Sequence, residues 1–127
     1  MFWKREAGNK GEELAVQFLK RKGMKIIERS YRVKAGEIDI IAKDRQTYCF
    51  IEVKSRSSDK FGKAIEAIDH KKRIRITRAA LWYIQSKHLT ESPCRFDVVA
   101  IQYPEDGQPP EIQWIQNAFE MDERYRY

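Results

Sequence analysis

Two strand-like runs of the sequence, joined by a short polar connector, carry charged residues in their middles. The runs span 37–42 and 48–54, and the connector KDRQT has about the length of a hairpin loop. Asp39 lies between two isoleucines, although Asp is among the poorest strand formers. Any fold for this chain must therefore pair the two runs in a sheet and accommodate the charges that they carry.

The position of each charge in its run decides the face from which it projects, because side chains alternate across a strand. Glu52 and Lys54 share one face, and in a hairpin Asp39 can project from that same face. The Cβ atoms of opposed residues lie about 4.5–5.5 Å apart, and those of diagonal residues about 7–8 Å. Two carboxylates at such a distance repel each other and favour a hard divalent cation, because Mg²⁺ takes carboxylate oxygens. Lys54 can reach the same place.

A half-solvated sheet is the other explanation for these charges. Antiparallel sheets commonly face water on one side, and Glu and Lys suit a wet face. Alternation by itself favours this explanation, since a D…ExK pattern is short and arises often by chance. Two features weaken it: Asp39 has Ile on both sides, and Ile41 and Phe50 make the shared face partly apolar.

The rest of the chain predicts an α/β fold with one sheet and helices packed on it. The expected elements are a helix over 8–22, strands over 24–33, 37–42 and 48–54, a helix over 63–88 with a break near Asp69, and a strand over 95–102. IQWI, at 112–115, can add a short fifth strand. The apolar stripes that we expect comprise Leu14, Ala15, Phe18 and Leu19 in the first helix, and Ile74, Thr77, Leu81 and Ile84 in the second.

The length of 127 residues suits one domain. We expect a single domain over 1–127, with an ordered core at about 8–119 and a charged tail at 120–127. No apolar run approaches the roughly 18–20 residues of a membrane span, and the N-terminus lacks the apolar region of a secretory signal. Cys49 and Cys94 form no CxxC pair, which predicts two reduced thiols in a cytoplasmic protein.

Glu12 and Glu13 fall in the first turn of the expected first helix. Asn9 can be its N-cap, which would put Glu12 at the third position of a capping box, where a carboxylate also favours the helix dipole. That is a sufficient structural reason for Glu12. Glu12 also borders the apolar stripe, whereas Glu13 lies on the wet side. If the helix packs on the sheet, Glu12 is the better placed to join the two strand carboxylates.

The chain is basic, with 25 Lys and Arg against 19 Asp and Glu, and this balance permits a polyanionic partner without requiring one. The second helix carries the run HKKRIRITR, at 70–78. A solvated helix face and a phosphate-contacting ridge explain this run equally well. Lys72 is spaced from Ile68 so that it can lean toward the sheet. Arg56 and the loop SSDKFG, at 57–62, can line a groove that leads to the Glu52 strand end.

Six blocks of the sequence, found in order between Gly8 and Phe119, resemble a known family. The blocks are GNKGEELAVQFLKRKG, GEIDIIAKD, FIEVKSR, FGKAIEAIDHKK, RFDVVAI and IQWIQNAF. They are similar to those of the YraN family, small bacterial proteins related to the PD-(D/E)xK nucleases and to archaeal Holliday-junction resolvases. The resemblance implies a restriction-endonuclease-like core, which is a mixed β-sheet flanked by helices.

The resemblance also carries the nuclease motif onto individual residues. The motif falls on Asp39 and on Glu52, Val53 and Lys54, with Glu12 as the helical acid. The resemblance implies that Asp39, Glu52 and the Val53 carbonyl hold Mg²⁺ or Mn²⁺, and that Glu12 binds the metal through water or holds a second ion. Lys54 would orient the attacking water or stabilise the charge of the transition state.

We therefore expect a metal-dependent endonuclease that hydrolyses nucleic-acid phosphodiester bonds, with DNA as its partner, branched DNA included. The backbone of the DNA would be held by Arg56, Lys71, Lys72 and Arg75. A homodimer follows by analogy with junction resolvases, which cut two strands symmetrically. Ile38 departs from the pattern, because the superfamily name implies proline there. A DNA-binding module that does not cut, and a protein-interaction domain that uses Trp and Tyr, stay open as alternatives.

Overall fold

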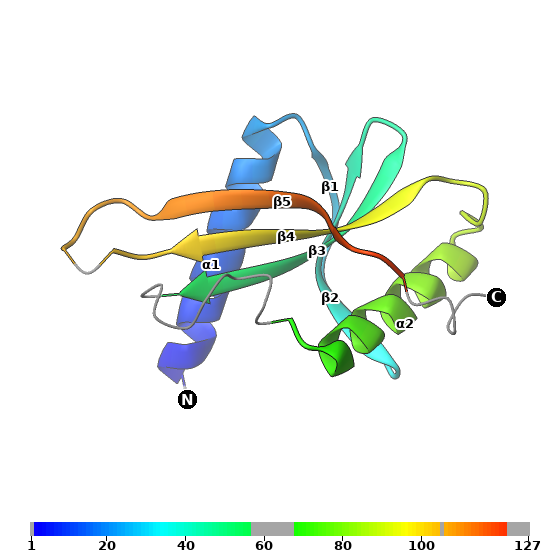
Figure 1. Cartoon of the computed structure of the whole chain (residues 1–127), viewed down its shortest axis with the longest axis horizontal. Coiled ribbons are helices and arrows are strands. Elements are labelled where there is room, and N and C mark those ends of the chain that lie inside the picture. The colour runs from blue at the N-terminus through cyan, green and yellow to red at the C-terminus, as the bar shows by residue number, and fades with distance from the viewer. Residues whose placement is uncertain (1, 57–67, 105, 122–127) are drawn as a thin grey trace.

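A single mixed sheet forms the centre of the molecule. The computed structural model describes residues 2–56, 68–104 and 106–121. The five strands follow one another across the sheet in chain order, with β3 and β4 parallel and the other neighbours antiparallel. The predicted mixed sheet flanked by helices is confirmed, with the fifth strand included (Figure 1). The elements are α1 (Phe2–Arg21), β1 (Lys25–Val33), β2 (Gly36–Asp44), β3 (Thr47–Arg56), α2 (His70–Ser86), β4 (Cys94–Gln102) and β5 (Glu111–Phe119).

The two helices cover opposite faces of the sheet (Figure 1). On one face, Val16 and Leu19 of α1 pack with Ile51 of β3. On the other face, Tyr83 of α2 packs edge-on against Phe50, with ring centroids 6.0 Å apart. Because Phe50 and Ile51 are neighbours on one strand, β3 is covered on both sides. Any charged side chain of β3 that points toward a helix is thereby removed from water.

The first helix is longer than the sequence pattern predicts. It begins at Phe2, so Asn9 lies inside the helix and is not its N-cap. One glycine inside a helix costs only about 1 kcal/mol, and good helix formers such as Lys4 and Ala7 precede Gly8, which explains why the helix continues through it. The predicted apolar stripe is largely confirmed, since Ala15 and Leu19 are fully buried. Among the described residues, no helix is long and apolar enough to cross a membrane.

The second helix begins later than predicted, at His70. Asp69 is its N-cap, with extended backbone angles, and its side chain accepts a hydrogen bond from the Lys72 N–H at 2.9 Å. The predicted helical residues 63–67 lie outside the described residues. The predicted stripe is wrong in part: Ile74 and Leu81 are only half-buried, because α2 presents a neighbouring face to the sheet. That buried face comprises Ile76, Thr77, Ala79, Ala80, Tyr83 and Ile84.

The hairpin formed by β2 and β3 has a tighter turn than the five-residue connector predicted. Pairing extends to Asp44 and Thr47, which leaves only Arg45 and Gln46 between the strands. At the other end of β2, Gly36 packs against α2, where an added Cβ would overlap the backbone carbonyl of Arg75. Only glycine allows this close approach. The start of β2 is thereby held next to the middle of α2.

Candidate active site

Asp39 lies where β2 and β3 separate. The pairing of the two strands ends at Ile40 and Ile51. Beyond it, the Asp39 Oδ2 accepts a hydrogen bond from the backbone N–H of Val53 at 2.8 Å. The carboxylate takes the place of a strand partner at the end of this ladder, which explains how an aspartate is accommodated inside a strand. The same bond fixes the direction of the Asp39 side chain.

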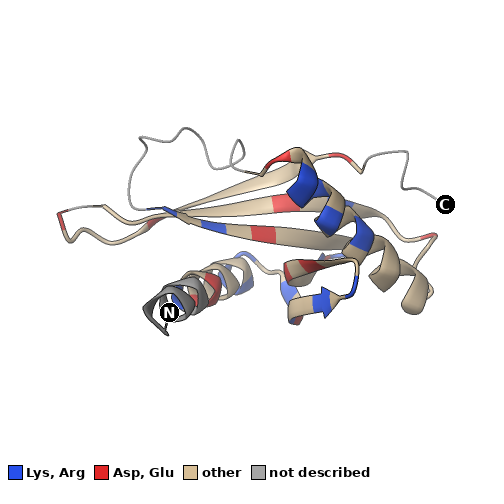
Figure 2. Cartoon of the chain, turned by 90° about the horizontal axis from the view of Figure 1, so that it is seen from below, with Lys and Arg blue, Asp and Glu red and all other residues tan. Residues whose placement is uncertain are grey.

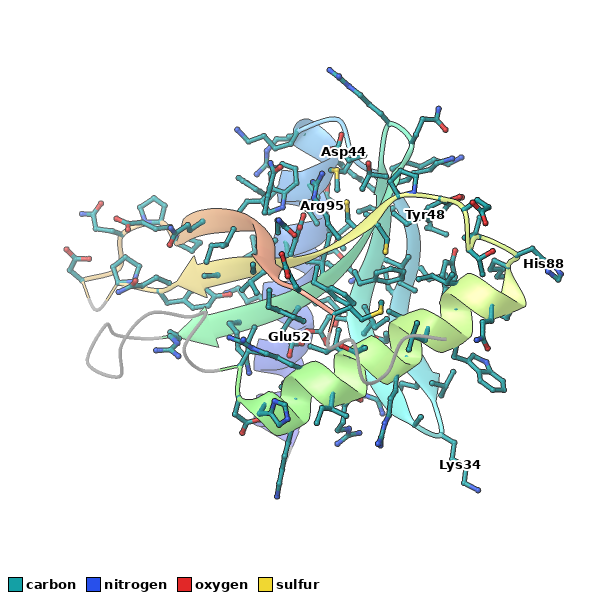
Figure 3. The ribbon with its side chains drawn as sticks, turned by 45° about the vertical axis from the view of Figure 1, so that its right-hand side comes forward. Lys34, Asp44, Tyr48, Glu52, His88 and Arg95 are labelled. Carbon is teal, nitrogen blue, oxygen red and sulfur yellow. The ribbon has the colours of Figure 1, made fainter. Side chains whose placement is uncertain are left out.

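Glu52 projects from β3 toward the start of α2 and is only 4% exposed (Figure 3). The explanation by a solvated sheet face is therefore wrong for this residue. The Lys72 Nζ lies 2.8 Å from the Glu52 Oε2, which makes an ion pair. The orientation is not that of a hydrogen bond, however, and among the described residues Oε2 has no hydrogen-bond partner. Burial, followed by the adjacent Asp39 carboxyl, raises the pKa of Glu52 to about 8.

Two lysines face these carboxyl groups. Burial and the positive charge of Lys72 lower the pKa of Lys54. Burial acts on the pKa of Lys72 in the same direction, but the contact with Glu52 outweighs it and the net direction is upward. Two carboxyl groups and two amino groups therefore share one partly buried place. The structure thus brings Asp39, Glu52 and Lys54 together as predicted, and adds Lys72 to them.

Glu12 comes from α1, which covers the other face of the sheet. Its Oε1 accepts a hydrogen bond from the Ser30 hydroxyl at 3.2 Å and lies 3.7 Å from the Arg29 Nε. Burial, and then the charge of Asp39, raises the pKa of Glu12, so the two carboxyl groups interact electrostatically. The explanations by a capping box and by the helix dipole are wrong, because Glu12 lies in the middle of α1. Its part in the site stays a prediction.

The residues predicted to hold nucleic acid take different positions. Lys71 and Arg75 are exposed on α2 and, with Lys72, line a pocket of about 290 Å³. Lys72 also turns to Glu52, as described above. Arg56 is half-buried at the end of β3, and its carbonyl accepts a hydrogen bond from the Tyr103 N–H at 2.8 Å. The loop at 57–62 lies outside the described residues, so the groove predicted there stays a prediction.

Sequence reasoning missed two residues that position the site. Asp69 caps α2 and bonds the backbone of Lys72, which sets the point from which that lysine reaches Glu52. An Asp directly before a helical run was the available signal. Gly11 brings α1 against β3, because an added Cβ would overlap the hydroxyl of Ser55, the residue after Lys54. No pattern in the sequence indicated that contact.

The donor chemistry of the site suits a hard divalent cation. Burial and the adjacent Asp39 carboxyl raise the pKa of Glu52, and a cation bound by both carboxylates would offset their repulsion. The Glu52 Oε2 is buried and receives no hydrogen bond from the part of the chain that the structure describes, and carboxylate oxygens are the ligands that Mg²⁺ takes. No group of three or more Asp, Glu, His or Cys side chains that could hold a metal occurs within the described parts of the chain. Asp39 and Glu52 are the adjacent carboxylates that the site offers to a cation.

Comparison with known proteins identifies the family. A model of the uncharacterised protein family UPF0102 matches residues 11–101, a range that contains every acid and lysine of the site. The chain belongs to UPF0102. A UPF0102 protein of Syntrophus aciditrophicus is 44% identical over 90% of this chain and 88% of its own length. A UPF0102 protein of Clostridioides difficile is 46% identical over 91% of this chain and 97% of its own. The resemblance to the YraN family is thereby confirmed, since UPF0102 is that family.

Proposed function

We propose that this UPF0102 protein is a Mg²⁺- or Mn²⁺-dependent nuclease that hydrolyses phosphodiester bonds in branched or otherwise structured DNA. The observation that carries the proposal is the buried Glu52 carboxyl, whose pKa is raised beside Asp39 and whose Oε2 has no hydrogen bond from the described residues. Strongly perturbed groups with specific charged neighbours concentrate at functional sites. A lysine of lowered pKa, Lys54, lies in the same place.

Each residue of the cluster has a role that its surroundings support. Asp39, Glu52 and the Val53 carbonyl would hold the cation, with Glu12 acting through water. When bound, a divalent cation supplies positive charge against the phosphate and makes water more acidic. The Val53 N–H keeps the Asp39 carboxylate in place. Lys54 orients the water that adds to phosphorus, and stabilises the charge on the phosphate as the bond to the leaving oxygen breaks.

Lys72 has a role that its place on a basic helix did not predict. Its ammonium group neutralises Glu52 and competes for the oxygen that a cation would take. Lys72 also lines the pocket beside Lys71 and Arg75, so a phosphate that enters the pocket would attract it away from Glu52. We infer that Lys72 moves between the Glu52 carboxylate and the nucleic-acid backbone.

A cleavage assay with matched variants tests the proposal. Labelled branched, single-stranded and duplex DNA would be incubated with Mn²⁺ or Mg²⁺. Asp39→Asn keeps an acceptor for the Val53 N–H, so we expect the fold to persist while cleavage falls by about 10²- to 10³-fold, the usual loss for one electrostatic group. Lys54→Met should lose a similar factor. Lys20→Met, which removes an exposed lysine of α1, is the control and should cut normally. Cleavage that survives in both site variants would sink the assignment.

A nucleic-acid-binding module that does not cut is the second candidate. Two observations favour it: Lys72 already neutralises Glu52, and the described residues contain no group of three metal-binding side chains. This candidate predicts salt-dependent binding with a slope set by the phosphates that are neutralised, and no product with any metal. Calorimetry with Mn²⁺ on the wild type and on Asp39→Asn/Glu52→Gln distinguishes the two candidates. A nuclease site predicts that the wild type releases heat on binding Mn²⁺ and that the double variant does not.

A further inference from the structure

The outward face of α2 carries three basic residues that are followed by an exposed tryptophan. Lys71, Arg75, Arg78 and Trp82 are spaced three or four residues apart, so their side chains succeed one another along one face of the helix. Trp82 is 58% exposed, and among the described residues no other large hydrophobic side chain is exposed to this degree. We call these four residues the α2 stripe.

Packing of α2 on the sheet does not require the α2 stripe. The helix docks through its opposite face, where Ala79, Ala80 and Tyr83 are buried. Another basic residue of the helix, Arg73, is anchored to the body of the molecule. Its Nε donates to the Ile68 carbonyl at 3.1 Å, and its guanidinium lies 5.3 Å from the centre of the Phe119 ring. The basic run of α2 therefore contains an arginine that is held against the body of the molecule as well as residues that are exposed, among them Lys71 and Arg75.

The α2 stripe begins at the candidate active site. Lys71 and Arg75 line the same pocket as Lys72, whose ammonium contacts Glu52. Figure 2 shows basic residues on successive turns of the first half of α2. The ten residues from Lys72 to Trp82 span about 15 Å along the helix.

A second element adds positive charge beside the α2 stripe. Lys34 lies at the tip of the turn between β1 and β2 and points away from the body of the molecule (Figure 3). The close packing of Gly36 on the backbone of Arg75 holds this turn next to the helix. A surface that combines these cations with one aromatic ring complements a phosphate backbone whose bases are accessible.

We propose that the α2 stripe binds a strand with unpaired bases, and that Trp82 stacks on one of these bases. The inference rests on the proposed function, because it takes the substrate of the same site to be nucleic acid and names its class. Contacts of Lys71 and Arg75 to phosphates do not depend on base pairing. A duplex hides the faces of its bases, so Trp82 gains a partner only where bases are unstacked.

Binding measured in EDTA tests the inference without cleavage. Fluorescence anisotropy would follow a labelled single strand and a duplex of the same length at several salt concentrations. Trp82→Ala should weaken single-strand binding by about 5- to 140-fold, the usual effect of losing one stacked base, and leave duplex binding and the salt slope nearly unchanged. Trp82→Phe should restore most of the loss. Arg75→Ala should weaken both ligands and lower the salt slope by about one unit. Gln85→Ala, on an exposed position one turn further, is the control.

Each other outcome has a definite meaning. Equal losses for single strand and duplex in Trp82→Ala, or no loss for either, would overturn the inference. A changed sedimentation coefficient in Trp82→Ala with unchanged DNA affinity would assign Trp82 to a protein interface and overturn it as well. A single-strand preference that depends on Trp82, without cleavage by the wild type, would keep the α2 stripe and reject the nuclease. If cleavage is lost in Asp39→Asn but the affinity for a single strand is unchanged in Trp82→Ala, the nuclease assignment would stand and the α2 stripe would be rejected.

Discussion

Glu52 and Asp97 are both carboxyl residues buried within strands of the same sheet, yet their surroundings differ. Asp97 is fully buried and accepts hydrogen bonds from the Arg95 Nε, from the Trp114 indole at 3.0 Å and from the Asn117 N–H at 2.9 Å. Glu52 has an ion pair with Lys72, and none of the described residues donates a hydrogen bond to its Oε2. A buried acid with all its donors in place stabilises a fold, whereas one that lacks donors retains capacity for a ligand.

The backbone around Asp97 is shaped to satisfy it. The pairing of β4 with β5 shifts register on either side of Asp97, and Asn117 opposite has a positive φ of 52°. This bulge turns the Asn117 N–H toward the carboxylate. Arg95 extends the network to β2, since its Nη2 lies 3.1 Å from the Asp44 Oδ2 (Figure 3). The Asp97 network thereby ties three strands together, whereas the pairing of β3 with β4 runs through Glu52 without a register shift.

The largest effect that we expect is a loss of stability when the Asp97 carboxyl is removed. Asp97→Ala leaves the half-buried Trp114 and Arg95 donors without an acceptor and should lower the free energy of unfolding by about 3–5 kcal/mol. Urea denaturation followed by circular dichroism measures this. Glu91→Ala, at an exposed position, is the control and should change little. A loss below about 1 kcal/mol, the worth of one ordinary hydrogen bond, would show that water replaces Asp97 and would break the comparison.

The thiol of Cys49 reports on the same network. Burial, and then the charge of Asp97, raises the pKa of Cys49 to about 12, so almost no thiolate is present at neutral pH. We expect Ellman's reagent to modify the exposed Cys94 first and Cys49 only when the protein opens. Asp97→Ala should speed the modification of Cys49 by about 10²- to 10³-fold, in line with its loss of stability. An equal acceleration in Glu52→Gln would contradict the distinction between the two acids.

The pH dependence of stability should depend on Glu52. Its pKa is raised on folding from 4.5 to about 8, so between these values the folded state holds a proton that the unfolded state has released. Stability from this group is therefore complete below about pH 4.5 and is lost as pH rises toward 8, by up to about 1.4 kcal/mol per pH unit. Urea denaturation across this range should show that Glu52→Gln removes this slope and is at least as stable as the wild type at pH 8. An unchanged slope would place the proton elsewhere.

The smallest effect that we expect concerns competition at Glu52. Lys72→Met removes the ammonium that neutralises the carboxylate, so Mn²⁺ should bind a few-fold more tightly while DNA binds more weakly. The effect is modest because the Lys72 side chain is more than one third exposed and its charge is screened. Calorimetry measures the affinity for Mn²⁺, and fluorescence anisotropy measures the affinity for DNA. Lys87→Met, which removes an exposed lysine just beyond the end of α2, is the control. Weaker Mn²⁺ binding in Lys72→Met would show that Lys72 supports the metal site instead of competing with it.

Sequence patterns predicted the elements of the fold better than their ends. The strands of the hairpin were identified because alternation and the polar turn are local signals. The start of α1 was missed because an Asn that resembles a cap lies inside a longer helix. In α2, the positions of Ile74 and Leu81 at the border of the buried face follow from how the helix rests on Phe50 and its neighbours. That packing involves residues distant in the chain.

The same signal that indicated Asp39 applies to Asp97, and the sequence did not distinguish them. Both are aspartates inside apolar strands, IDI in one case and FDV in the other. In the structure, Asp97 accepts hydrogen bonds from donors of β5. No local sequence pattern predicts these hydrogen bonds. An acid inside a strand therefore predicts a buried polar partner, and only the nature of that partner separates a structural role from a chemical one.

The sequence by itself predicted that Asp39, Glu52 and Lys54 lie close together, because their places in two strands joined by a short connector are properties of neighbouring residues. It determined the family for the same reason, through blocks that follow one another along the chain. Only the tertiary structure decided that Glu52 is buried, that Lys72 forms an ion pair with it and that the charge of Asp39 raises the pKa of Glu12. Burial and charge interactions depend on distance in space, and α2 contributes Lys72 from a place twenty residues further along the chain than Glu52.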